Sequence, residues 1–338
     1  MKREASRSWS ADRLLELGRS YQPAAVYAAA AELNLFGALA DGALTAGELS
    51  RKLRCPFRGI GILLDALAAL RLVQKRANRY SLPARAGAFL TANAPRSVLA
   101  MAQHQANCLR KWAQLAHVVK AGRPAQRTPS VRGEAGDAAA FIGAMHHLSA
   151  PTADRVIRAL HPLRFGHLLD IGGAAGTWTC AFLRACPSAR ATLFDLPHVI
   201  PLARRHLAAA GLARRITLVP GDFLADALPS GADLAWVSAI VHQNSRAQNR
   251  ALFANAFQAL VPGGRIAIRD ILMEASRTRP LAGTLFAVNM LVATEGGRTF
   301  TFDELREDLE SVGFVRAAVV RRDEAMNSLV VARKPHRK

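Results

Sequence analysis

The sequence contains no long apolar run. Hydrophobic residues make up 51% of the 338 residues, yet no uninterrupted stretch approaches the ~20 residues that a membrane span requires. The first ten residues, MKREASRSWS, are basic and polar and lead into a charged segment, so they lack the apolar core of a secretory signal. We therefore expect a cytoplasmic protein without a membrane span, and a disordered terminus over residues 1–10.

Cysteine is scarce as well. The chain has four cysteines, Cys55, Cys108, Cys180 and Cys186, and they form no CxxC pair. They also lack the paired spacing with histidine that structural zinc sites use. We interpret them as buried, reduced thiols, and the sequence predicts no metal site.

Acidic residues are few in comparison with basic ones. The 25 Asp and Glu residues stand against 45 Lys and Arg residues, which gives a formal net charge of +20. Such an excess favours nucleic acid, an anionic membrane surface or an acidic substrate as a partner. The arginines are spread along the chain and form no single block, which argues against a dedicated nucleic-acid partner.

The length suggests about two domains, and the first is predicted over residues 11–95. Its pattern is mainly helical, with Thr45 placed to cap a helix that has Glu48 three residues later. A second helix is expected to end near Arg71, and residues 71–83 alternate apolar and polar side chains like a short β-hairpin. Together these elements predict a winged helix-turn-helix.

Winged helices often bind DNA, so that role must be weighed. The second predicted helix argues against it, because its best face is apolar and few of its side chains could reach base edges. We prefer packing against another subunit, and hence a homodimer formed through this domain. The apolar face comprises Ile60, Leu63, Leu64, Leu67 and Leu70.

Residues 96–160 are predicted to be a helical connector that contributes to the acceptor pocket. The connector is interrupted by a loop over residues 122–137, which is rich in Gly, Pro, Arg and Ser. The helix after this loop leads directly into the second domain, predicted over residues 161–338.

The second domain alternates short apolar runs with helical stretches. This alternation predicts an α/β fold with a Rossmann-like, doubly wound parallel sheet. The expected strands lie in residues 167–173, 189–196, 215–222, 233–240 and 264–272.

A glycine-rich turn follows the first of these strands and opens a helix. Its spacing is not the GxGxxG of nicotinamide-binding proteins. Small residues in such a turn let a ligand approach the backbone closely. The predicted cofactor-binding residues here are Asp170, Gly172, Gly173 and Gly176.

Carboxylates end the next two strands. Asp195, nineteen residues after Gly176, stands where a carboxylate can accept hydrogen bonds from both ribose hydroxyls, and Leu196 is assigned to the site with it. Asp222 could receive an adenine amino group while Phe223 covers the ring. Three successive strand ends therefore predict a nucleoside site.

These motifs resemble a known family. DIGGAAG, FDLPHVI, GDF, the VPGGR turn and TFDELREDLESVGF are similar to the small-molecule O-methyltransferases that include caffeic acid, hydroxyindole and polyketide O-methyltransferases. The resemblance extends over nearly the whole chain, including the winged-helix dimerisation domain. It implies S-adenosylmethionine as the cofactor, S-adenosylhomocysteine as its product, and an acceptor held between the two domains.

The resemblance also implies catalytic roles. His242 would remove a proton from the acceptor hydroxyl, Asp270 would brace it, and Ser238 would stand where the family has a cofactor-contacting lysine or similar residue. Two departures weaken the match: Gln243 and Asn244 follow His242 where the family usually has Asp-Trp, and Thr299 replaces a second acidic residue, for which Glu295 is a candidate substitute.

The acceptor pocket is also assigned by resemblance. Its predicted lining is Phe141, Met145, Asn289 and Met290. Three alternatives stay open at this point: carbon or nitrogen methylation on the same scaffold, a DNA-binding regulator that senses S-adenosylmethionine, and a binding protein without turnover.

Overall fold

A computed structural model describes residues 9–92 and 94–336, which form two compact units. One unit holds the described residues up to Arg110 together with Arg127–His147, and the other holds Lys111–Gln126 and the residues from Leu148 onward. The predicted connector, residues 96–160, is thus divided between them. Leu99 and Ala102 belong to the core of the first unit, whereas the backbone of Ala125 bonds to Val292 in the second.

The first unit is a helical domain with a small sheet. The hairpin predicted in residues 71–83 is present and turns at Ala77, and a third strand extends it to the order β1-β3-β2. Thr45 and Glu48 form the expected capping box. Residues 1–8 of the predicted disordered terminus lie outside the described residues, and Ser10 caps the first helix. The elements are α1 (Ala11–Arg19), α2 (Tyr21–Glu32), α3 (Leu35–Ala38), β1 (Leu44–Thr45), α4 (Ala46–Leu53), α5 (Phe57–Ala69), β2 (Gln74–Arg76), β3 (Arg79–Ser81), α6 (Ala84–Leu90), α7 (Leu99–Trp112) and α9 (Gly133–Ser149), the last two ending beyond the boundary of the unit.

Helix α5 does not offer the apolar face that was expected for a subunit contact. Its residues Ile60, Leu64 and Leu67 are buried in the core of their own unit. Apolar side chains that are more than half exposed lie at other positions of α5, Phe57 and Ile62, and on α1, Leu14, Leu15 and Leu17; none of the α1 residues is buried. The sequence pattern alone could not distinguish a face that packs internally from one that is left for a partner.

The loop predicted over residues 122–137 is shorter than expected, because α9 begins at Gly133. The Asp137 carboxylate accepts a hydrogen bond from the Ser130 backbone N–H at 3.0 Å, which ties the first turn of the helix to the preceding chain. Glu134 in that first turn is also favourable to a helix start. Both acidic side chains therefore favour a helix that begins within the predicted loop.

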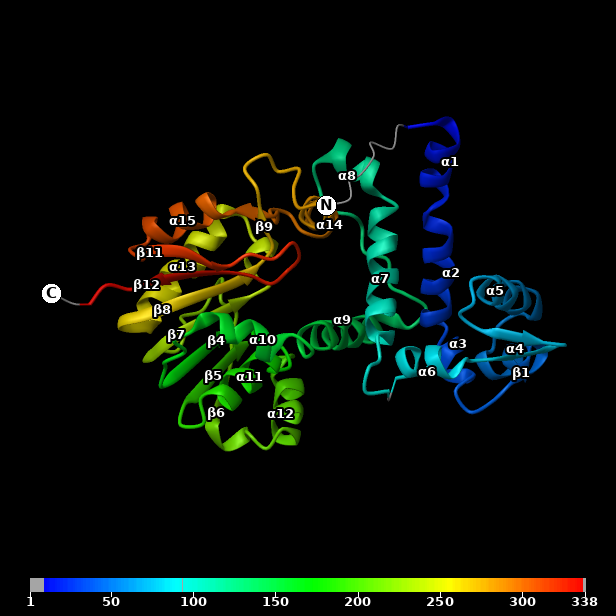
Figure 1. Ribbon diagram of the computed structural model, residues 1–338, viewed down its shortest axis with the longest axis horizontal. Helices are drawn as coiled ribbons and strands as arrows, with labels where there is room; N and C mark the ends of the chain where they lie inside the picture. Colours follow the sequence, from blue (N-terminus) through cyan, green and yellow to red (C-terminus); the bar gives the residue numbers. More distant parts are fainter. Residues whose placement is uncertain (1–8, 93, 337–338) are drawn as a thin grey trace, which may run out of the picture. The chain divides into compact units, whose positions relative to one another are not determined.

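The second unit contains the predicted doubly wound sheet (Figure 1). Its seven strands run in the order β11-β12-β8-β7-β4-β5-β6, and β12 alone among them runs antiparallel to its neighbours. The strands are β4 (His167–Ile171), β5 (Arg190–Asp195), β6 (Ile216–Pro220), β7 (Ala232–Ser238), β8 (Leu260–Asp270), β11 (Val315–Arg321) and β12 (Ser328–Arg333), with β9 (Leu272–Met273) and β10 (Phe300–Thr301) paired separately.

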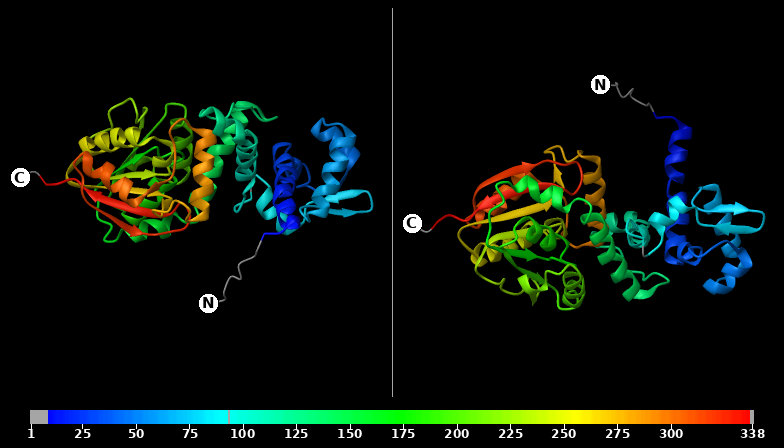
Figure 2. Two further views of the ribbon diagram at one scale, coloured as in Figure 1. Left: turned by 90° about the horizontal axis from the view of Figure 1, so that it is seen from above. Right: turned by 60° about the horizontal axis from the view of Figure 1, so that its bottom comes forward.

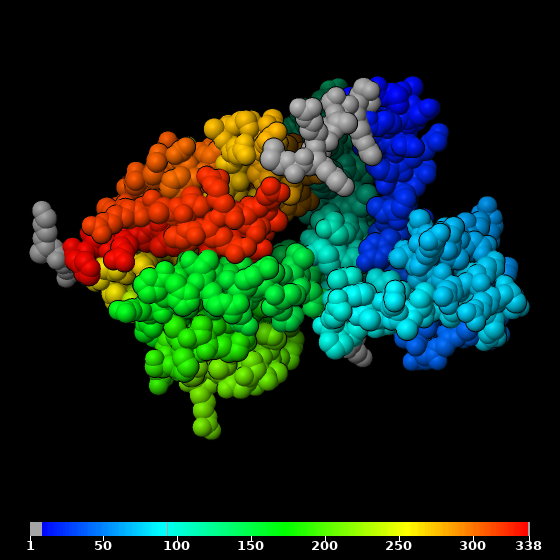
Figure 3. All heavy atoms as spheres, viewed as in Figure 1, coloured from blue at the N-terminus to red at the C-terminus, as the bar shows by residue number. Residues whose placement is uncertain are grey.

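Helices cover both faces of this sheet, as Figures 1 and 2 show. α10 (Ala153–Ile157) and α11 (Thr177–Ala185) pack on one face around Trp236, and α13 (Arg246–Ala259) and α15 (Phe302–Ser311) pack on the other around Ile268. The outer side of β11 stays on the surface (Figure 3). The remaining elements are α8 (Leu115–Ala121), η1 (Arg158–Leu160), α12 (Ile200–Ala209), η2 (Ala213–Arg215), η3 (Val241–Gln243) and α14 (Leu281–Ala293).

Two expectations about the whole chain can be compared with the structure. Of the four cysteines only Cys180 is buried, since the other three lie at partly exposed positions, and none of them forms a disulfide. Within the part of the chain that the structure describes, every helix is too short or too polar to cross a bilayer.

Candidate functional site

The glycine-rich turn connects β4 to α11 at the point where the strand order reverses. Gly172 and Gly176 have φ values of +69° and +78°, which residues with a Cβ rarely adopt. A Cβ at Gly172 would also meet Ile240 Cδ1 at 2.7 Å. Ligands of open α/β sheets bind at such a switch point, outside the carboxyl ends of the strands.

Asp195 and Leu196 lie beside this turn. The Asp195 carboxylate accepts hydrogen bonds from the backbone N–H groups of Ala174 and Leu196, each at 2.7 Å. Burial raises the pKa of Asp195, while these two N–H groups act in the opposite direction. The end of β5 is thereby joined to the glycine-rich turn.

Phe223 also reaches the turn, since its Cε1 atom would lie 3.8 Å from a Cβ built on Gly172. Asp222 precedes it and is only partly buried. Its Oδ1 accepts from the Leu224 N–H at 2.9 Å, so the carboxylate also shapes the local loop. The structure therefore places both predicted residues at the carboxyl end of β6.

Asp170 is buried beneath the turn, where a Cβ built on Gly173 would lie 3.0 Å from its carboxyl carbon. Its carboxylate is 1% exposed and accepts a hydrogen bond from the hydroxyl of Thr179 on α11. Burial raises the pKa of Asp170 to about 7, an effect that the nearby charge of Asp195 reinforces and the Thr179 hydroxyl opposes. Ser238, at the end of β7, accepts from the Arg269 guanidinium at 3.1 Å.

His242 and Asp270 meet at the same edge of the sheet. Nδ1 of His242 lies 2.9 Å from both carboxylate oxygens of Asp270, and the two side chains are 7% and 2% exposed. Oδ1 of Asp270 also accepts from the Ile271 N–H at 2.8 Å. Nε2 of His242 makes no hydrogen bond within the described residues and is not sealed from solvent. This geometry fixes the imidazole with Nδ1–H donating to the carboxylate and leaves Nε2 as a proton acceptor.

The other acidic candidate does not join this pair. Glu295 is exposed and is not hydrogen-bonded to His242, and Thr299 is buried with its carbonyl accepting from Arg277. Phe286 was missed by the sequence reasoning. Its ring stands edge-on to the His242 imidazole, with the centroids 4.7 Å apart.

The four predicted acceptor residues divide between the two units. Phe141 and Met145 lie on α9 of the first unit, where Phe141 is exposed and contacts His104. Asn289 and Met290 lie on α14 of the second unit, three and four residues after Phe286. The Asn289 side chain accepts a hydrogen bond from the Trp112 indole at 3.0 Å, whereas Met290 is buried.

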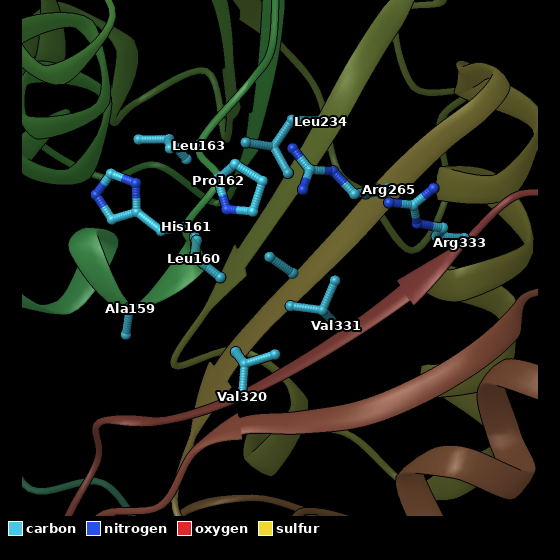
Figure 4. Close-up of a pocket in the computed structure, with 11 residues that line it drawn as sticks. Ala159, Leu160, His161, Pro162, Leu163, Leu234, Arg265, Val320, Val331 and Arg333 are labelled. Atoms are coloured by element: carbon cyan, nitrogen blue, oxygen red, sulfur yellow. The ribbon is translucent and has the colours of Figure 1, made fainter.

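A cavity of about 190 Å³ lies elsewhere in the second unit (Figure 4). Residues 159–163 form one side, and side chains from β7, β8, β11 and β12 form the other, including Arg265 and Arg333. None of the predicted site residues lines it.

The residues at the carboxyl edge of the sheet fit S-adenosylmethionine. A nucleoside requires a carboxylate for its ribose, an aromatic surface for its base and a backbone that it can approach closely. This site offers a partly buried carboxylate at the end of β5, an aromatic ring after β6 and the glycine-rich turn. Fold and site together define the class of S-adenosylmethionine-dependent methyltransferases.

Comparison with known proteins gives the family. Residues 112–315 match the O-methyltransferase domain, and residues 15–92 match the O-methyltransferase dimerisation domain. The chain therefore belongs to the O-methyltransferase family, as the motifs predicted, and S-adenosylmethionine is its cofactor.

Individual relatives agree with this assignment. The 3-hydroxy-5-methyl-1-naphthoate 3-O-methyltransferase of Streptomyces sahachiroi is 32% identical over 87% of this chain and 86% of its own length. The tetracenomycin polyketide synthesis 8-O-methyl transferase TcmO of Streptomyces glaucescens is 30% identical over 95% and 96%. The structure of human N-acetylserotonin methyltransferase in complex with SAM superimposes with a TM-score of 0.82 at 27% identity, covering 98% of this chain and 99% of that one.

Proposed function

We propose that the protein methylates a hydroxyl group of a small aromatic or polyketide-type acceptor, with His242 as general base and Asp270 as the residue that positions it. The observation that carries this proposal is the buried pair itself: Nδ1 of His242 is held 2.9 Å from the Asp270 carboxylate, while Nε2 has no hydrogen-bond partner among residues 9–92 and 94–336. Comparable pairs act as proton acceptors in many enzymes.

The chemistry divides between the cofactor and the chain. S-adenosylmethionine, when bound, supplies a methyl group already activated by its positive sulfonium. His242 accepts the hydroxyl proton on Nε2 as the new oxygen–carbon bond forms and the sulfur–carbon bond breaks, leaving S-adenosylhomocysteine. Asp270 stabilises the imidazolium produced, which would otherwise be a buried cation without a partner.

The acceptor class rests on the relatives and on the surroundings of His242. Two similar proteins are named for a hydroxynaphthoate and for a polyketide. Phe286 offers an aromatic surface at His242, and Asn289 and Met290 follow on the same helix at the spacing that places them near it. Phe141 and Met145 remain predicted acceptor contacts from α9.

A homodimer is part of the same proposal. The segment that matches the dimerisation domain begins at residue 15 and includes most of α1. Leu14, Leu15 and Leu17 leave this helix with an exposed apolar surface, which a second copy of the chain would cover.

The test is turnover with S-adenosylmethionine and a panel of hydroxynaphthoates and hydroxyindoles, followed by mass spectrometry of the products. We expect methyl ethers, and a loss of about 10²- to 10⁴-fold in kcat for His242→Ala, the usual contribution of a general base. S-adenosylhomocysteine affinity should stay within about twofold, because His242 lies outside the nucleoside contacts. Full activity of His242→Ala, or methylation of amino analogues alone, would contradict the proposal.

A further inference from the structure

Arg269 is a buried cation that the proposed reaction leaves without a role. It lies on β8 next to Asp270, but strand alternation places its side chain on the opposite face, with Ala267 and Trp236. The residue is 5% exposed. Arginine is almost never buried to this extent without a partner of opposite charge.

Its contacts are neutral. Nε donates to the Asn327 side-chain oxygen at 2.9 Å, Nη1 donates to the Ser238 hydroxyl at 3.1 Å, and the guanidinium carbon lies 4.6 Å from the centroid of the Trp178 ring. Within residues 9–92 and 94–336 it forms no ion pair with a carboxylate. Burial lowers the pKa of Arg269 to about 10, with Asp270 and Asp323 opposing that effect, so the group is charged at neutral pH.

One end of the guanidinium is still available. Nη2 makes no hydrogen bond within the described residues, and it is not one of the nitrogens that are enclosed without a partner. Ser238 is the direct cross-strand partner of Arg269 and ends the strand beside β4, from which the glycine-rich turn begins. Trp178 lies in the first turn of α11, directly after that glycine-rich turn. The available nitrogen is therefore held among elements of the cofactor site.

We propose that Arg269 binds the α-carboxylate of S-adenosylmethionine and so selects the intact cofactor over nucleosides that lack the amino-acid portion. This carboxylate is the one anionic group of the cofactor. The guanidinium is held by neutral hydrogen bonds and an aromatic ring, so its positive charge is not neutralised by a carboxylate of the described chain. It can therefore form a charge-assisted hydrogen bond with the ligand, which is stronger than a hydrogen bond between neutral groups. The inference rests on S-adenosylmethionine being the cofactor and is independent of the acceptor and of His242.

The test compares two ligands by isothermal titration: S-adenosylhomocysteine, and 5′-methylthioadenosine, which has no carboxylate. Arg269→Met should weaken S-adenosylhomocysteine binding about 10- to 100-fold, the range for hydrogen bonds to charged groups, and change 5′-methylthioadenosine binding less than about twofold. Arg265→Met is the matched control, because Arg265 lies on the same strand and face but points to residues 159–163 (Figure 4). It should leave both affinities unchanged.

The α-carboxamide analogue of S-adenosylhomocysteine separates binding from a structural effect. The wild type should lose affinity for it, whereas Arg269→Met should bind amide and acid about equally. If Arg269→Met does not fold, Arg269→Lys is measured instead. Its ratio of acid affinity to amide affinity should be lower than that of the wild type but still above one. Equal weakening of both nucleosides, or unchanged acid-over-amide preference, overturns the proposal. Failure of the wild type to bind any nucleoside would instead overturn the cofactor assignment.

Discussion

Replacing Asp270 by asparagine tests how the histidine is controlled, because the change keeps the size of the side chain. Oδ1 of Asp270 already accepts from the Ile271 N–H at 2.8 Å, so the amide oxygen of asparagine would keep that position. Its NH₂ group would then face Nδ1 of His242, where Oδ2 now lies at 2.9 Å. An NH₂ donor there requires Nδ1 to be an acceptor, which moves the imidazole proton to Nε2.

The size of the effect follows from this tautomer. An imidazole with its proton on Nε2 cannot take the proton of the substrate hydroxyl. The other tautomer, with its proton on Nδ1, could do so, but its N–H would face the NH₂ group of the asparagine in a buried site. Losing that hydrogen bond and the charge that stabilises the imidazolium costs about 3–5 kcal/mol together. Since 1.4 kcal/mol corresponds to a factor of ten, kcat should fall by about 10²- to 10⁴-fold.

The assay is single-turnover methyl transfer with S-adenosylmethionine, accompanied by S-adenosylhomocysteine titration. Binding should be unchanged in Asp270→Asn, because the Asp270 side chain contacts His242 and lies on the face of β8 opposite to Arg269. Adding Asp270→Asn to His242→Ala should cost no more than about a further twofold, since the carboxylate acts through the imidazole. A variant that keeps more than half of the wild-type rate, or losses that multiply in the double variant, would refute this reasoning.

Three further predictions concern other residues. Asp195→Asn should weaken S-adenosylhomocysteine binding about 10- to 100-fold in calorimetry, because ribose hydroxyls lose a charged acceptor; unchanged affinity would remove Asp195 from the site. Asp170→Asn should flatten the pH dependence of stability. Because the pKa of Asp170 is raised to about 7, the folded protein holds a proton that the unfolded chain releases near pH 4. The wild-type free energy of unfolding therefore falls between about pH 4 and pH 7, by at most about 4 kcal/mol, and the variant should lack this decline. Urea unfolding at pH 5 and pH 8 measures this change in the free energy of unfolding, and an equal change in the wild type and the variant would contradict the prediction. Leu14→Glu combined with Leu17→Glu should convert a dimer to a monomer in light scattering, because charges would occupy the exposed apolar face of α1; a dimer that persists places the interface elsewhere.

Much of the second unit could be predicted because local patterns and tertiary structure agree there. The five predicted apolar runs became β4 to β8, and the glycines at 172 and 176 occupy the backbone conformations that favour glycine. The first unit was harder to predict from the sequence. The apolar face of α5 packs internally and the exposed leucines lie on α1, a distinction that depends on which helices pack together and not on periodicity.

The placement of the candidate site residues could be predicted for those at strand ends, and could not where it depends on the direction of a side chain. Asp195, Phe223, His242 and Asp270 follow from their places at the ends of strands. Asp170 also ends a strand, but its side chain turns into the core toward Thr179, which spacing could not show. Phe286 carried a signal only in retrospect, since it precedes Asn289 and Met290 by three and four residues on one helix.

Gln243 and Asn244 follow His242 where the family usually has Asp-Trp, which weakens the resemblance in sequence. In the structure, the backbone of His242 is nevertheless held in place. Asn244 is buried and donates to the Asn249 side chain at 3.1 Å, and Asn249 donates in turn to the Val241 carbonyl at 3.0 Å, so η3 is tied to α13. Gly297 closes the other side, since a Cβ there would lie 2.6 Å from the His242 carbonyl oxygen. Because the backbone of His242 is held from both sides by residues of this chain, aspartate and tryptophan are not needed to aim the imidazole at Asp270.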